Sequence, residues 1–130
     1  MMHIDPQQEL FAALKIGLEE KGQAVFDGVL PPEDTPYPFT YLGDFQQIDR
    51  EHKNAVTGSV LATLHVWHNN TRQRGTLSKM LLEVKEVCRS TQKTNNFSWG
   101  VRNITQRILP DNTTAQPLLH GIIEAEFYFS

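Results

Sequence analysis

The chain has 130 residues, of which 39% are hydrophobic and 21% are charged, a balance typical of folded rather than disordered proteins. Twelve Lys and Arg residues against fifteen Asp and Glu residues give a net charge of −3, which argues against a protein whose main task is gripping nucleic-acid phosphates. The single Cys88 excludes an internal disulfide, and no apolar run approaches the ~20 residues of a membrane helix. We therefore expect one soluble domain over residues 1–130, made in a reducing compartment.

The N-terminal region predicts a helix followed by a short strand. Asp5 and Pro6 are a typical helix start, because aspartate caps free backbone N–H groups and proline tolerates the first helical position. Apolar residues then recur at helical spacing, so a helix is predicted over residues 6–21. Residues 24–26 are expected to form a short strand.

A proline-rich connection leads into the next strand. Four prolines lie between residues 29 and 38, a density that excludes a helix or a central strand and predicts a rigid, extended segment. A strand is expected over residues 39–42, ending at Gly43. Residues 43–54 are mostly polar and mixed in charge, and we expect them to form a long loop.

The central region carries the clearest patterns. Over residues 55–67 apolar and polar side chains alternate, which predicts a half-buried strand whose inner face is made of Val56, Val60, Ala62, Leu64 and Val66. Residues 72–89 predict an amphipathic helix whose apolar stripe is made of Leu77, Met80, Leu81, Val84, Val87 and Cys88.

The C-terminal region predicts two more strands. Alternation indicates one strand at residues 97–102 and another at residues 118–129, with a turn-rich loop over residues 110–117 between them. The predicted order of elements is α-β-β-β-α-β-β. We therefore predict an α+β fold, with a mostly antiparallel sheet of four to five strands and two helices packed on one face.

The histidines do not form a recognisable metal site. His65 and His68 are three residues apart on a predicted strand, so their side chains point to opposite faces. His3, His52 and His120 belong to separate elements. We expect no metal and no cofactor.

Other reactive residues also lack catalytic partners. Cys88 lies on the apolar stripe of a helix, where a buried thiol is inert. Glu124 and Glu126 share one face of the last strand, as expected of a sheet surface in contact with water. We expect no catalytic residues.

Four large apolar residues interrupt the polar faces of the two best strands. Strand faces with several such residues often contact another chain, and aromatic residues are favoured at interfaces. We therefore expect this protein to form oligomers, with a protein-interaction surface that includes Leu61, Trp67, Ile122 and Tyr128.

The order of short motifs resembles one family of phage proteins. Tyr37-Pro38-Phe39 precedes a strand, His65-Val66-Trp67 ends a long strand, and His120-Gly121 lies near the start of the last strand. This arrangement resembles the tail-completion proteins of long-tailed bacteriophages, also called tail terminators or tail-to-head joining proteins, over about residues 6–129. His68 departs from the pattern, since many relatives carry serine there.

The resemblance implies a structural protein of the virion that is assembled in the cytoplasm of the bacterial host. Such a protein forms a ring, typically a hexamer, which caps the finished tail tube and joins the tail to the head. Its implied partners are further copies of itself, the major tail tube protein and a head-completion or stopper protein. DNA would pass through the lumen without specific binding, and no membrane is involved.

Two alternatives stay open at this point. One is a head-side neck adaptor or stopper, another small protein of the same region of the virion. The other is a small cytosolic metal-dependent enzyme that uses His65, His120 and the acidic face of the last strand.

The predicted loop at residues 43–54 is a second candidate interaction segment. We expect Phe45 and Ile48 to anchor in a neighbouring protein, so that replacing both by serine leaves folding intact but blocks assembly. The alternative is a mobile hairpin tip without such a role. The polar residues expected around the two anchors are Gln46, Gln47, Asp49, Arg50, Glu51 and Lys53.

Overall fold

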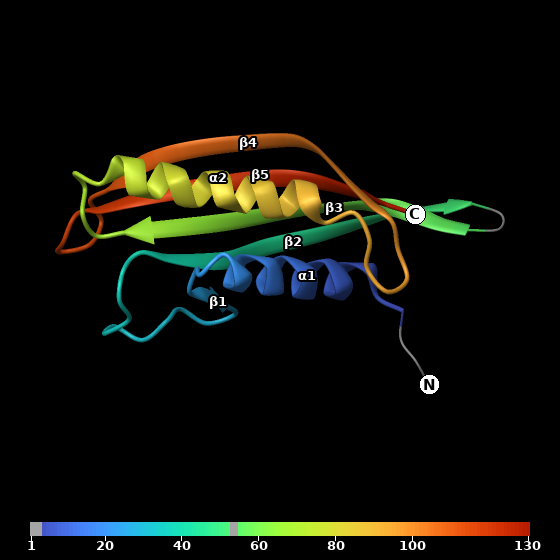
Figure 1. Cartoon of the computed structure of the whole chain (residues 1–130), viewed down its shortest axis with the longest axis horizontal. Helices are drawn as coiled ribbons and strands as arrows, with labels where there is room; N and C mark the ends of the chain where they lie inside the picture. Colours follow the sequence, from blue (N-terminus) through green and yellow to red (C-terminus); the bar gives the residue numbers. More distant parts are fainter. Residues whose placement is uncertain (1–3, 53–54) are drawn as a thin grey trace.

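The computed structural model describes residues 4–52 and 55–130, in which two helices cover one face of a five-stranded sheet (Figure 1). The sheet has the strand order β1-β2-β3-β5-β4, and β1 with β2 is its parallel pair. This confirms the predicted α+β fold and the predicted order of elements. The elements are α1 (Pro6–Glu20), β1 (Val25–Asp27), β2 (Phe39–His52), β3 (Ala55–His68), α2 (Arg74–Ser90), β4 (Trp99–Asp111) and β5 (Leu118–Phe129).

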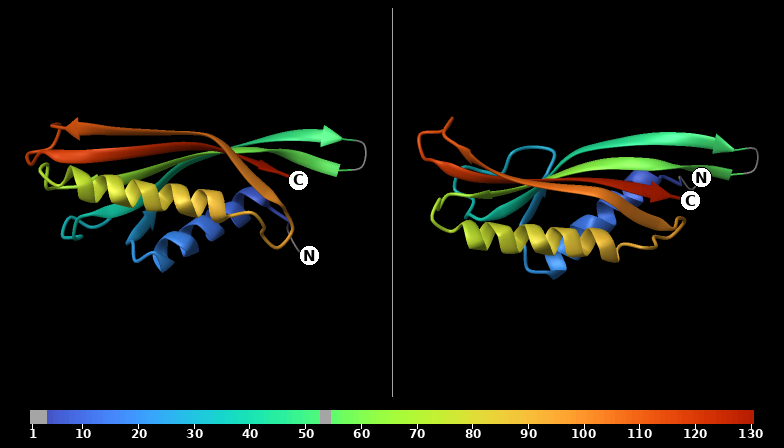
Figure 2. Two further views of the ribbon diagram at one scale, coloured as in Figure 1. Left: turned by 45° about the horizontal axis from the view of Figure 1, so that its top comes forward. Right: turned by 90° about the horizontal axis from the view of Figure 1, so that it is seen from above.

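Helix α1 begins as its sequence predicts, α2 begins two residues later than predicted, and both helices pack through their predicted apolar stripes. The Asp5 side chain accepts a hydrogen bond from the backbone N–H of Gln8, which satisfies one of the free donors at the start of α1. The predicted stripe of α2 is buried in full, from Leu77 to Cys88. The two helices lie on the same side of the sheet (Figure 2), and their leucines enclose one core with the inward residues of β3 and β5.

Glycines allow the helices to approach their neighbours closely. A Cβ atom at Gly17 of α1 would lie 2.7 Å from a methyl carbon of Val87 in α2. A Cβ atom at Gly121 of β5 would lie 2.9 Å from Leu81 of α2. A larger residue at either position would therefore force helix and neighbour apart.

Gly17→Ala is expected to lower the free energy of unfolding by about 1 kcal/mol. Alanine gains about 1 kcal/mol in helix propensity, but overpacking against the stiff Val87 side chain costs about 2 kcal/mol. In a Val87→Ala background the same change should instead be stabilising. Urea denaturation of the four proteins of this cycle measures both effects. Gly75→Ala is the matched control, because no atom lies within 4 Å of a Cβ there.

The prediction of a loop over residues 43–54 is wrong. Its described part, residues 43–52, continues β2 as a strand that pairs with β3 as far as His52 and Ala55. After Phe45, which packs against α1, polar residues dominate both faces because the end of this hairpin extends past the helices (Figure 2), so burial imposes no apolar alternation there. Lys53 lies outside the described residues, as do His3 and the side chain of Val56.

Strand β4 is also longer than its sequence predicts. It runs through Asp111, so the expected loop at 110–117 begins later and the strand at 97–102 is extended. A bulge at residues 103–104 shifts its register with β5, and Asn103 adopts a left-handed conformation with φ 54°. A bulge at residues 43–44 likewise shifts the register of β2 with β3. Such bulges break the period-two pattern from which strands are predicted.

Candidate interaction surface on the open face of the sheet

The face of the sheet opposite the helices, here called the open face, carries the candidate site (Figure 2). Side chains alternate along each strand, so the register places every second residue of β3 and β5 on this face. Among them are all four interface residues predicted on these strands. Leu61 keeps 37% of its surface exposed, Trp67 and Tyr128 are half-buried, and Ile122 is only 9% exposed. Whether they contact another chain stays a prediction.

Four rings form a row across three strands of the open face. Trp67 of β3 stacks on His120 of β5 with ring centroids 3.7 Å apart, and His120 stacks on His65 at 4.9 Å. Tyr41 of β2 lies next to His65, at 6.2 Å. A Cβ atom at Gly43 would lie 2.7 Å from Nε2 of His65, so the β2 bulge leaves room for this ring.

A hydrogen bond joins the two histidines. Nδ1 of His65 and Nε2 of His120 are 2.7 Å apart, so one donates while the other accepts. Burial lowers the pKa of His65, and the nearby Glu124 partly opposes this. Burial, together with the charge of His65, lowers the pKa of His120 to about 4. The pair is therefore uncharged at neutral pH, and the row presents a neutral aromatic surface.

The geometry of the histidines agrees in part with the sequence prediction. His65 and His68 do point to opposite faces, and His68 is buried on the helix side, where it donates to Gln73. Among the sequence-based interpretations, His65 and His120 are placed together only in the alternative of a metal-dependent enzyme, because no local pattern shows the pairing of β3 with β5 that brings them together. Within residues 4–52 and 55–130, no group of three His, Cys, Asp or Glu side chains could hold a metal ion. Burial raises the pKa of the Cys88 thiol to about 12.

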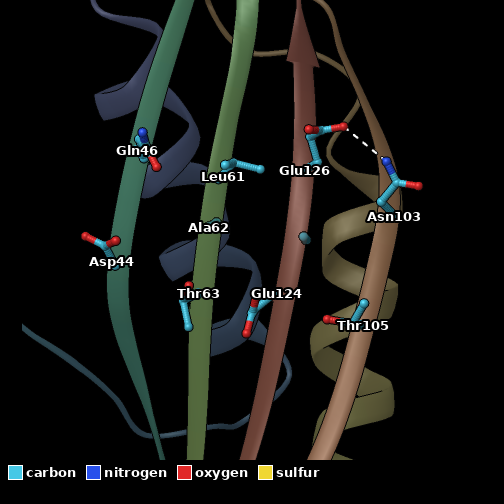
Figure 3. Close-up of a pocket in the computed structure, with 10 residues that line it drawn as sticks. Asp44, Gln46, Leu61, Ala62, Thr63, Asn103, Thr105, Glu124 and Glu126 are labelled. Carbon is cyan, nitrogen blue, oxygen red and sulfur yellow. Dashed lines mark hydrogen bonds between the residues drawn. The ribbon is translucent and has the colours of Figure 1, made fainter.

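A shallow hollow of about 320 Å³ lies beside this row, where the bulges of β2 and β4 flank the central strands (Figure 3). Asn103 donates a hydrogen bond to Glu126, and Arg107 lies 3.6 Å from Glu124 in a pair whose side chains are more than half exposed. Such an ion pair adds little stability. The hollow is lined by Asp44, Gln46, Leu61, Ala62, Thr63, Asn103, Thr105, Glu124, Ala125 and Glu126.

The predicted residues of β2 are divided between its two faces. Gln46, Ile48 and Arg50 pair with residues of the open face, and Ile48 is 44% exposed. Phe45 lies on the helix side and packs edge-on against Phe11 of α1, with centroids 5.5 Å apart. Gln47, Asp49 and Glu51 follow Phe45 on that side. The expectation that Phe45 lies outside the core is therefore wrong.

A second surface escaped sequence analysis. The proline-rich connection folds back at one end of the sheet, where Tyr41 donates a hydrogen bond to the carbonyl of Gly28. Val29 and Leu30 are 80% and 79% exposed. Leu30 lines a groove of about 400 Å³ whose other lining residues, most of them apolar or proline, include Trp67 and Leu118. The prolines indicated rigidity, but not which residues would face outward.

Comparison with known proteins finds similarity to this chain among solved structures. No family model matches this sequence, and a search of curated proteins finds no significant match. One solved chain belongs to a structure described as the virion of a native gene transfer agent particle. It superposes with a TM-score of 0.64 at 14% identity, over 96% of this chain and 95% of that chain. The two chains share a fold.

A second solved structure, known only by a sequence identifier, gives a TM-score of 0.62 at 13% identity over 95% of each chain. At these identities both likenesses concern the fold alone. No helix among the described residues combines the length and apolar character needed to cross a bilayer.

The histidine pair should make this protein less stable in acid. Since burial holds the pKa of His120 near 4 while the unfolded value is 6.5, the unfolded state binds the proton first as pH falls. Stability from this source is complete above pH 6.5 and is lost between pH 6.5 and pH 4. The expected loss is about 1–2 kcal/mol, after solvent screening of a half-exposed ring is allowed for.

Denaturation free energies measured from pH 7.5 to pH 4 test this expectation. His120→Phe keeps the stacking but removes the titration, so its stability should fall less steeply with pH than that of the wild type. His52→Gln, at an exposed position of β2, is the control and should keep the wild-type slope. Parallel profiles for wild type and His120→Phe would contradict the expectation.

Proposed function

We propose that this protein is a structural component of a phage-like virion, which caps the tail tube as a homo-oligomeric ring and joins the tail to the head. The observation that carries the proposal is the fold shared along almost the whole chain with a chain from a gene transfer agent virion. The order of the Tyr37-Pro38-Phe39, His65-Val66-Trp67 and His120-Gly121 motifs supports the finer assignment to a tail terminator.

The surface of the subunit supports a role in assembly. A sheet with one uncovered face, aromatic and aliphatic side chains on that face and unpaired edges is typical of a chain that completes its surface with neighbours. We assign the contacts to Leu61, Trp67, Ile122 and Tyr128 on the open face and to residues 45–51 of β2. The partners would be further copies in a hexamer-sized ring, the major tail tube protein and a head-completion protein.

The charge of the chain fits a channel for DNA. With a net charge of −3, and with Asp44, Glu124 and Glu126 along the hollow, the subunit offers few sites for phosphate groups. Arg107 lies beside Glu124, and Arg102 lies over the ring of Tyr128 at 5.2 Å. DNA would therefore slide past such a ring without being held.

Electron microscopy of particles made without this protein tests the proposal. We expect overlong, uncapped tails that are not attached to heads, and normal virions once the wild-type chain is supplied in trans. Tails of normal length that fail to join heads would favour the head-side stopper. Normal, infectious particles would contradict a role in the virion.

A further inference from the structure

The two outer strands of the sheet leave backbone edges without a strand partner. β4 forms one edge, where Trp99 at its start donates its N–H to the carbonyl of Gln92 and residues 100–111 have no strand on their outer side within the described chain. On the other side, β1 pairs only with residues 40–42 of β2, so residues 43–52 have no strand beside them within the described chain. Exposed edges of this length are templates for pairing with another chain.

The two free edges run in opposite directions. β2 is antiparallel to β3, β3 to β5 and β5 to β4, so β2 and β4 are antiparallel to each other. When copies repeat around a ring axis, β4 of one copy can therefore meet β2 of the next as an antiparallel pair. Antiparallel pairing continues the pattern already present inside the subunit.

Hydrogen bonding shows which groups of β2 point outward. The carbonyl of Phe45 accepts a bond of 3.2 Å from the Gln7 side chain of α1, so it points away from β3. Backbone groups alternate along a strand, and no bulge interrupts residues 45–52. Gln47, Asp49 and Glu51 therefore direct their N–H and C=O groups to the free edge.

Pro110 shows which backbone groups of β4 point to the outer edge of the sheet. It pairs with Leu119 inside a regular ladder, where a proline is accommodated only if its nitrogen faces the outer edge. By alternation, Ile108 and Gln106 also direct their backbone groups outward. Both edges thus offer unpaired donors and acceptors.

The end of the β2–β3 hairpin lacks the support of a third strand. β5 accompanies β3 only as far as Gly58, which pairs with Phe129. Beyond that point Arg50 pairs with Thr57 in a two-stranded arm that projects past the sheet (Figure 2). A two-stranded hairpin is marginally stable in water, and a third strand stabilises it.

We propose that the free edge of β2 pairs antiparallel with the free edge of β4 in a second copy of this chain. The inference rests on the proposed function, because it names the contact on which the ring would be built. Pairing of β4 with β4 would bring Arg102 and Arg107 of two copies together on the open face, and pairing of β2 with β2 would bring Asp49 and Glu51 of two copies together on the helix side. Like charges directly opposite each other across strands are unfavourable. Pairing of β2 with β4 avoids both encounters in a register that keeps Arg50 of β2 away from Arg102 and Arg107.

Thiol cross-linking tests this contact directly. Asp49 and Gln106 are exposed and lie on the two edges, while the buried Cys88 can stay in place because its thiol is inaccessible. A chain with both Asp49→Cys and Gln106→Cys, treated with a flexible bis-maleimide at rising protein concentration, should form covalent trimers and larger species. A head-to-tail contact repeats, so the products should extend beyond dimers.

The single variants are the matched controls. Each alone should give no cross-linked product, and a mixture of the two should stop at dimers. Dimers from either single variant would show same-edge pairing and overturn the proposal. Absence of cross-linked products from the double variant at the highest concentration would also overturn it.

A backbone change gives a second, independent measurement. Gln47→Pro removes an outward N–H but no bond to β3, so in the two-cysteine chain it should lower the yield of trimers at least about tenfold while the melting temperature stays unchanged. If Gln47→Pro fails to fold, Gln47→Lys, which blunts the edge with a charge, replaces it. An unchanged yield in a folded variant would count against the contact.

The two proposals can fail separately. If tails made without the protein are uncapped but the two-cysteine chain gives no cross-linked ladder, the role in the virion is supported and the proposed contact is contradicted. If the chain gives a cross-linked ladder but tails made without the protein are normal, the contact is supported and the role in the virion is contradicted.

Discussion

Gly58→Ala is expected to lower the free energy of unfolding by about 3 kcal/mol and the melting temperature by about 10 °C. A Cβ atom at Gly58 would lie 2.2 Å from the carbonyl oxygen of Ile48 in β2 and 2.8 Å from the ring of Phe129 in β5. A backbone oxygen cannot move aside as the end of a flexible side chain can. The three strands would therefore have to separate where the hairpin arm leaves the sheet.

Urea denaturation and thermal melting of the variant measure the effect. Gly100→Ala is the matched control, because Gly100 lies in β4 opposite Tyr128 and no atom lies within 4 Å of a Cβ there. It should be neutral or stabilise slightly, since alanine restricts the unfolded chain. Equal stability of the two variants would show that residues 48–52 do not pair with β3 as described.

Phe45→Ser and Ile48→Ser are expected to separate folding from assembly. Phe45 is half-buried against Phe11 and the core, so its loss should cost about 2 kcal/mol of stability. Ile48 is 44% exposed on the open face, so Ile48→Ser should change stability by less than about 0.5 kcal/mol. The expectation that both can be replaced without loss of stability is therefore revised.

Ile48→Ser is expected to have its larger effect on assembly. If Ile48 contacts a neighbouring protein, Ile48→Ser should fold normally but fail to complement particles that lack this protein. Infectious yield measured in trans, with Leu82→Ser as the control on an exposed position of α2, tests this. Full complementation by Ile48→Ser would remove residue 48 from the proposed interface.

The sequence by itself determined the elements whose burial is periodic. The stripe of α2 from Leu77 to Cys88 and the alternation of β5 from Leu118 to Phe129 were predicted with nearly the observed bounds. In these elements one face meets the core along the whole length, so each turn of helix or pair of strand residues repeats the same pattern. The two-helix, mostly antiparallel fold followed from them.

Only the tertiary structure decided what lies outside that periodic burial. Residues 43–52 are strand because β3 supplies their backbone partners, although both faces are largely polar. The bulge at Asn103 interrupts the alternation of β4, so its second half could not be recognised from the pattern. His65 and His120 are 55 residues apart in the chain and meet only through the register of β3 with β5. Long-range pairing of this kind leaves no local signal, because the partner that satisfies each backbone group lies elsewhere in the sequence.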